Sequence, residues 1–526
     1  MFDLIIRNGS VVNGTAIVPG PSDVGVTGGR IIAVERIDPA APAARTIDAA
    51  GKVVCPGFID IHTHSDLSLV ADGIGESKLR QGVTTEVVGN CSFAAFPIEP
   101  SRLELHADHL ARATTALTPW WTDLDGYADA LHETGLGINV APLAGHGTLR
   151  VAALGVDQRP PTGDELNRMR GDLAHALDQG AFGMSTGLTH VPSAYGAFDE
   201  VAALARVLAD RGALYATHSR VSGDGERGSV GEAIDLGRET GVTVEFSHLA
   251  INHPDRWGTG ERLVSLFDEA RAAGVDISFD VYPYHASSSS LTQYLPPWVQ
   301  AGGTEGMRAR LADPIERDRA LQDMNGGWFG GIPWLFDRFV VSDSPDGEGA
   351  GKSLADLSEE TGIDPYELTL QLCERYGNRL QVVLFYRTEE DVSTFLAHPL
   401  AVVGSDGNAI PLDQGANRPH PRHFGTFPRV LGRFVRQRKV LSLTDAIRKM
   451  TVEPARRLGL ADRGVLRPGA VADIVVFEPD TVIDNAEFGE APAAPTGVDL
   501  VVVNGTVMLA DGVLGSERPG QVLRRP

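Results

Sequence analysis

Short apolar runs alternate with longer helix-forming stretches through the middle of the chain, from Gly57 to about Arg456. Helical signals lie between the runs, for instance in Pro161–Gln179 and Pro314–Met324. The apolar runs predict eight strands, near Gly57–His62, Thr84–Val88, Gly137–Leu143, Phe182–Thr186, Ala213–His218, Val242–His248, Val275–Val281 and Ala401–Ser405. Strands and helices that alternate in this way are typical of a (β/α)8 TIM barrel, an α/β fold.

The two ends of the chain share another pattern, in which apolar residues flank an Asn-Gly pair. FDLIIRNGSVVN, which begins at Phe2, and LVVVNGTVMLADGV, which begins at Leu500, each predict a β-hairpin. We expect residues 1–56 and 457–526 to form one small β-sandwich domain, with the barrel, residues 57–456, inserted between its halves. Further strands of this domain are expected at Val24–Val34, Gly51–Val54 and Ala472–Phe477.

The segment between the seventh and eighth predicted strands is much longer than an ordinary barrel loop. It covers residues 285–400 and carries several helical stretches, so we expect an inserted lid or pocket wall at the catalytic face. The serine run Ser287–Ser290 is interpreted as a flexible turn. The pattern does not indicate which residues of the insertion line a pocket.

Composition excludes several classes of partner. The 526 residues suit one barrel of about 250 residues with insertions and a minor domain. A dispersed net charge of −23 argues against nucleic acid, which is bound by clustered lysine and arginine. We expect no membrane partner and a cytoplasmic location, because no leader-like start and no apolar stretch of about 18 residues occur. The three cysteines, Cys55, Cys91 and Cys373, do not make a disulfide framework, and the oligomeric state is not predicted.

Metal-binding side chains follow several of the predicted strands. His62 and His64 lie two residues apart, so on an extended segment they face the same side and can share one ion. His218, His248 and Asp406 end or follow later strands, at the face where barrels keep their chemistry. The set predicts a metal-dependent hydrolase of the zinc type.

Cys91, just beyond the second predicted strand, is a sixth candidate ligand. Six ligands exceed what one zinc ion uses, so either two ions share a bridging ligand or one ion is tight and the other weak. Other interpretations remain open: Asp406 could cap the helix that follows it, and Cys91 could be a small core residue.

Seven motifs together resemble the D-aminoacylase, or N-acyl-D-amino-acid deacylase, branch of the amidohydrolase superfamily, from about residue 3 to residue 510. They are PGFIDIHTHSD, QGVTTEVVGNCS, FGMSTGLTHVPS, SHL, DVYPYHASSSSL, GSDG and HPRHFGTFPRVLG. The resemblance implies a zinc ion held tightly by Cys91, His218 and His248. It also implies a second, weaker site formed by His62, His64, Cys91 and Asp406, with Asp406 as the proton shuttle.

The chain departs from the family pattern at two positions. Ala250 stands where the family has a lysine that binds the substrate's α-carboxylate, while the other family positions for that group are present as Tyr282, Ser288 and Arg422. His190 stands where the family has a tyrosine that hydrogen-bonds the scissile carbonyl. An imidazole N–H can do the same work.

The resulting hypothesis is a zinc-dependent amidohydrolase that converts an N-acyl-D-amino acid, a small-molecule amide, into a carboxylate and a D-amino acid. Because Ala250 and His190 are altered, hydrolysis of a cyclic or carboxylate-free amide, or deamination, is the main alternative. A more distant alternative is a barrel that has lost catalysis and serves as a scaffold. All six predicted ligand residues are present, which argues against it.

Overall fold

Eight parallel strands surround a common axis in the centre of the protein. The structure, a computed structural model, describes residues 1–111, 117–221 and 226–525. The strands are β6 (Phe58–Asp60), β7 (Val83–Val88), β8 (Asn139–Pro142), β10 (Gly183–Gly187), β11 (Leu214–His218), β12 (Thr243–Phe246), β13 (Ile277–Val281) and β17 (Ala401–Val403). Each overlaps its predicted range, so the barrel is confirmed.

Backbone hydrogen bonds join the strands in sequence order. β6, β7 and β8 form one parallel set, and a short strand β9 (Ala144–Gly145) begins the other, which runs through β10 to β13 and then β17. The amide of Phe182 donates to the carbonyl of Pro142 at 2.9 Å and thereby links the two sets. At the other seam the amide of Asp406 donates to the carbonyl of His62 at 2.8 Å. The barrel therefore closes next to two of the predicted ligands.

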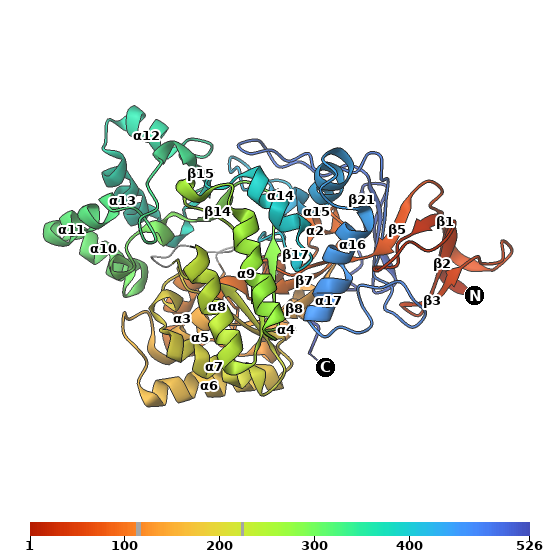
Figure 1. The fold of residues 1–526 in the computed structure, drawn as a ribbon, viewed down its shortest axis with the longest axis horizontal. Coiled ribbons are helices and arrows are strands. Elements are labelled where there is room, and N and C mark those ends of the chain that lie inside the picture. The colour runs from red at the N-terminus through yellow and green to blue at the C-terminus, as the bar shows by residue number, and fades with distance from the viewer. Residues whose placement is uncertain (112–116, 222–225, 526) are drawn as a thin grey trace.

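Helices cover the outside of the barrel between successive strands (Figure 1). They include α4 (Leu124–Thr134), α5 (His146–Leu154), α6 (Gly163–Asp178), α7 (Phe198–Ala209), α8 (Glu226–Thr240), α9 (Gly260–Ala272), α14 (Glu389–Ala397), α16 (Leu443–Met450) and α17 (Val452–Arg457). The start of α6 shows why these segments are helical, because Thr162 and Glu165 form a reciprocal capping box. In the described parts of the chain, no helix is both long enough and apolar enough to cross a membrane.

Both ends of the chain build a small β domain, as predicted. Its strands are β1 (Phe2–Val11), β2 (Ser22–Thr27), β3 (Arg30–Glu35), β4 (Ala43–Asp48), β5 (Val53–Pro56), β18 (Ile474–Phe477), β19 (Val498–Val503), β20 (Thr506–Ala510) and β21 (Val513–Leu514). The pairing of β18 with β5 joins the C-terminal strands to the N-terminal ones. Side chains from both ends, Leu4 and Val502 among them, share one apolar core.

The two Asn-Gly pairs have different structures. Asn504 and Gly505 form the expected turn of a hairpin between β19 and β20, both with positive φ. The predicted hairpin at Phe2–Asn13 is wrong, because β1 continues through Asn8 and Gly9 as one strand with an irregular register. The side chain of Asp23 on β2 accepts the Asn8 amide at 2.8 Å, so Asn8 makes a bulge in the strand and not a turn.

The insertion has its own sheet and its own apolar core. Its elements include β14 (Ser287–Ser290), α10 (Gly303–Ala312), α11 (Pro314–Asn325), β15 (Phe339–Asp343), α12 (Leu354–Thr361), α13 (Pro365–Tyr376) and β16 (Gln381–Leu384). The interpretation of Ser287–Ser290 as a flexible turn is wrong, since all four serines pair with β16 in an antiparallel ladder. In Figure 1 the insertion and the β domain lie at opposite ends of the long axis.

Candidate metal centre and cavity

All six predicted ligands lie at the carboxyl ends of barrel strands. His62 and His64 follow β6, Cys91 follows β7, and His218 is the last residue of β11. His248 and Asp406 come shortly after β12 and β17. Because parallel strands end at one rim, side chains far apart in the sequence converge there.

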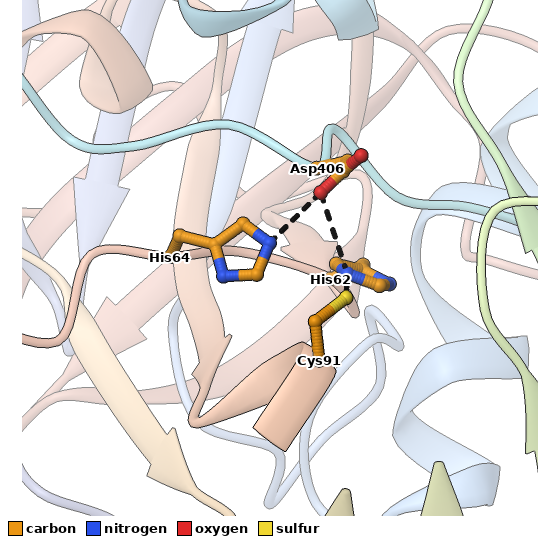
Figure 2. A group of neighbouring side chains, drawn as sticks. All are labelled: His62, His64, Cys91 and Asp406. Carbon is orange, nitrogen blue, oxygen red and sulfur yellow. Dashed lines mark hydrogen bonds and ion pairs between the residues drawn. The ribbon is translucent and has the colours of Figure 1, made fainter. Parts of the chain in front are cut away.

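The six side chains form two groups that share Cys91. One group is His62, His64, Cys91 and Asp406, and the other is Cys91, His218 and His248; within each group the ligand atoms lie within 4.8 Å of one another. The Cys91 Sγ lies 3.3 Å from Nε2 of His62 and 3.4 Å from Nε2 of His248. Figure 2 shows His62 and His64 pointing toward the Asp406 carboxylate, with the Cys91 sulfur beside them. Thiolate, imidazole and carboxylate donors at this spacing fit a metal of the zinc type.

Three of these residues adopt backbone conformations that are unfavourable for a side chain. Cys91 has φ +50°, His248 has φ +39° and Asp406 has φ +53°. Gly187 on β10 leaves room for the first of them, because a Cβ there would lie 2.2 Å from the carbonyl oxygen of Cys91. Left-handed backbone at non-glycine residues is concentrated where function requires a fixed geometry.

Outer contacts orient the histidines. The carboxylate of Asp280 on β13 lies 3.0 Å from Nδ1 of His62 and accepts the amide of His248 at 2.9 Å. Such a carboxylate fixes the tautomer of a histidine ligand and leaves the other ring nitrogen for the metal. The sequence analysis missed Asp280, although it is the first residue of the quoted motif DVYPYHASSSSL and lies near the end of a buried strand, a signal that could have identified it.

Electrostatics favour the ionised forms of Cys91 and Asp406. Burial opposes ionisation of the Cys91 thiol, but the neighbouring His62 and His248 hold its pKa well below the usual range. Burial likewise opposes ionisation of Asp406, and Arg422 and His64 nevertheless keep the pKa of that carboxyl well below its usual range. Both groups therefore have the charge that a cation site needs.

Arg422 lies against Asp406. Its guanidinium donates to Oδ2 of Asp406 at 2.7 Å and to the backbone carbonyl of Ser288 at 3.2 Å. The sequence analysis assigned Arg422 to a substrate carboxylate. In the structure its contacts hold the Asp406 carboxylate and the serine strand of the insertion together.

A cavity of about 480 Å³ opens above the metal-binding side chains. The barrel contributes His190, Ala250 and Tyr282 to its lining, and the insertion contributes Ser288 and others. The His190 ring lies 4.6 Å from that of His218, so the residue that replaces the family tyrosine is next to the candidate metal ligands. The cavity therefore brings the predicted catalytic and binding residues together.

Arg387 is a cavity residue that the sequence analysis did not identify. Its guanidinium lies 4.6 Å from the centre of the Tyr282 ring, and Arg422 lies 5.1 Å from the same ring. Among the described residues, neither the Tyr282 hydroxyl nor Nε of Arg387 has a hydrogen-bond partner. An arginine directly after the apolar run QVVLFY was the only sequence signal for this residue, and it is a weak one.

Comparison with known proteins assigns the family. The amidohydrolase family profile matches residues 45–311 and 369–509. N-acyl-D-glutamate deacylase of Alcaligenes xylosoxydans xylosoxydans is 38% identical, over 100% of this chain and 97% of that protein. The chain belongs to the amidohydrolase family. D-aminoacylase of the same organism is 34% identical over 100% of this chain and 98% of that protein, which places the chain in the N-acyl-D-amino-acid deacylase branch.

A solved structure from this branch has the same fold. It is the N-acyl-D-glutamate deacylase of Bordetella bronchiseptica in complex with zinc and a phosphonate inhibitor. The two chains share 36% identity over 99% of each, with a TM-score of 0.83. The present protein is accordingly a metal-dependent hydrolase that acts on C–N bonds other than peptide bonds.

Proposed function

We propose that the protein is a zinc-dependent deacylase that hydrolyses an N-acyl-D-amino acid to a carboxylate and a D-amino acid. The observation that carries this proposal is the arrangement of the cavity. A thiolate, histidine and carboxylate cluster lies beside Tyr282 and Arg387, which offer unpaired donors to an anion. A site for an N-acyl-amino acid needs both features, because the metal has to lie beside the amide carbonyl and a cationic side chain beside the carboxylate.

In this proposal Cys91, His218 and His248 hold the tighter zinc ion, and His62, His64, Cys91 and Asp406 form a second, weaker site. The sharing of Cys91 between the two groups supports this division. Zinc, when bound, supplies Lewis acidity toward a carbonyl oxygen and toward water. Asp280 would support the second site, because its carboxylate contacts Nδ1 of His62 and so orients that ring.

Asp406 moves the proton. Its Oδ1 faces His64 at 2.9 Å, while its Oδ2 is held by Arg422 at 2.7 Å, so the carboxylate has a fixed direction. In our assignment Asp406 accepts a proton from the attacking water. It then donates that proton to the leaving nitrogen. Because Arg422 stabilises the anionic form, Asp406 is deprotonated when the cycle begins.

His190 is assigned to the carbonyl oxygen. A ring N–H of His190 would donate to the oxygen as negative charge develops on it, the role that tyrosine has in relatives with the usual motif. The position of His190 beside His218, at the cavity wall, supports this role.

The three predicted residues, Tyr282, Ser288 and Arg422, are assigned to the α-carboxylate, and Arg387 is added to them. Arg387 supplies the cation that Ala250 does not, because its guanidinium stacks on Tyr282 and faces the same cavity. A charge-assisted hydrogen bond of this kind contributes about 1.5–3 kcal/mol.

The test is a substrate panel combined with two arginine variants. We expect the zinc-replete protein to hydrolyse N-acetyl-D-amino acids and not their L enantiomers, hydantoins or simple amides. Arg387→Met should raise KM by tenfold or more with a smaller effect on kcat, because one carboxylate contact is lost. Arg379→Met is the matched control, since Arg379 also lines the cavity but is exposed, and it should leave KM within about twofold.

Ala250→Lys adds a second cation and should lower KM for the same substrates. Efficient hydrolysis of cyclic or neutral amides, without any turnover of N-acyl-D-amino acids, would contradict the proposal. It would favour the carboxylate-free alternative instead.

A further inference from the structure

A bulge in the insertion directs an acidic side chain toward the cavity. β14, β16 and β15 form an antiparallel sheet in which Ser288 lies opposite Val383, and Val383 lies opposite Val340. The register of β15 shifts between Val341 and Asp343, so Asp343 pairs with Gln381. Without the extra residue, Asp343 would share the face of Val341, which packs in the apolar core of the insertion. With it, Asp343 lies on the face of Ser288.

The Asp343 carboxylate has no partner in the described residues. It is half-buried and lines the cavity, and no hydrogen bond or ion pair to it occurs among those residues. Burial alone raises the pKa of this carboxyl to about 6. Burying an acid without a partner is unfavourable, so a bound group that supplies a positive charge would be stabilised there.

The sheet also fixes the distance between Ser288 and Asp343, and this distance can be compared with the length of a substrate. Two strand spacings and a two-residue offset separate Ser288 from Asp343 by about 12 Å between Cα atoms. A D-lysine whose carboxylate lies at Ser288 reaches about 7.5 Å to its ammonium, from ordinary bond lengths. With one hydrogen bond of about 3 Å at each end, the extended substrate spans about 13.5 Å, which is enough to cover the separation.

We propose that Asp343 selects N-acyl-D-amino acids with a basic side chain, of the lysine and arginine class. This inference rests on the proposed deacylase function and names its substrate class. Asp343 also lies in the stretch between the two segments that match the amidohydrolase family, so the family match does not determine its role. The 38% identical relative is named for N-acyl-D-glutamate, whose side chain is a carboxylate. Asp343 would repel that carboxylate, so we expect N-acyl-D-glutamate to be a poor substrate of the present protein.

The experiment compares N-acetyl-D-lysine with N-acetyl-D-norleucine, which has a similar chain without the ammonium group. The zinc-replete wild-type protein should have a kcat/KM at least tenfold higher for the lysine derivative. Asp343→Asn should remove this preference by raising KM for the lysine derivative. Asp337→Asn is the matched control, because Asp337 is exposed, precedes the same strand and does not line the cavity.

Two outcomes would overturn the inference and are distinguishable. If the norleucine derivative is hydrolysed but the lysine derivative has no advantage, or keeps it in Asp343→Asn, Asp343 is not the determinant and the deacylase function stands. If no N-acyl-D-amino acid is hydrolysed, the inference fails together with the proposed function.

Discussion

At the scale of single residues, three side chains of the candidate metal centre are brought together by backbone conformations that are themselves unfavourable. Cys91, His248 and Asp406 all have left-handed φ values, which cost about 1–3 kcal/mol each. The surrounding barrel must stabilise these conformations, and the close packing of Gly187 against Cys91 is one visible contact that does so. The barrel backbone therefore fixes where these candidate ligands lie.

Cys91 belongs to both ligand groups, so its replacement should have the largest effect on metal content. We expect Cys91→Ala to purify with much less zinc and little activity, because the softest ligand of both groups is lost. Elemental analysis measures the metal directly. Cys55→Ala, which alters a buried cysteine of the β domain, should keep its zinc. Full zinc in Cys91→Ala would remove Cys91 from the ligand set.

The sequence predicted all six side chains that the structure brings together in the two candidate ligand groups, but not every residue around them. Histidines and acids at the ends of apolar runs are visible in the sequence because strand ends converge in a barrel. The contact of Arg422 with Ser288 and the stacking of Arg387 on Tyr282 depend on how the insertion packs on the barrel. No local spacing encodes that packing.

At the scale of elements, the seam of the barrel depends on one buried lysine. Lys78 on the short helix α2 (Glu76–Leu79) contacts Asp60 of β6 at 2.8 Å and Glu86 of β7 at 2.9 Å. It also donates to the hydroxyl of Ser405 at 2.8 Å, just after β17. One cation thus joins the first, second and last strands beneath the candidate metal centre.

Lys78→Met should destabilise the protein by about 3–5 kcal/mol, because it leaves two buried carboxylates without their cation. Urea unfolding followed by fluorescence measures the change. Lys352→Met removes an exposed pair with Glu360 and should cost less than about 1 kcal/mol. Equal effects of the two substitutions would show that the buried network does not stabilise the seam.

The wrong predictions at this scale have a common cause. An Asn-Gly pair and a serine run both have the composition of a turn, yet Asn8 and Ser288 lie within strands. In each case a neighbouring strand supplies hydrogen bonds that outweigh the local preference, from Asp23 for Asn8 and from β16 for Ser288. Tertiary pairing of this kind is not visible in a short window of sequence.

At the scale of the whole molecule, the candidate ligands come from β6, β7, β11, β12 and β17 or the turns after them, so the metal should tie distant parts of the barrel together. A ligand that binds only the folded state adds about 2.7 kcal/mol at one hundred times its Kd. For 526 residues this corresponds to a rise in Tm of about 2–3 °C.

Removal of the metal with a chelator should therefore lower Tm by about that amount, and added zinc should restore it. Calorimetry or differential scanning fluorimetry measures the shift. Cys91→Ala serves as the control and should respond to neither treatment. An unchanged Tm in wild-type protein shown by elemental analysis to be free of metal would contradict a site built across the barrel.

The most direct test of the proposed function is the release of free D-amino acid by the zinc-replete wild-type protein and by Asp406→Asn. The account predicts that the wild type releases the amino acid from N-acetyl-D-lysine and N-acetyl-D-norleucine but not from the L enantiomers. Asp406→Asn should be slower by about 10²–10⁴ because the proton-transfer group is removed, and it should keep the zinc ion assigned to Cys91, His218 and His248, which are unchanged. Equal rates for both enantiomers, or full activity in Asp406→Asn, would contradict it.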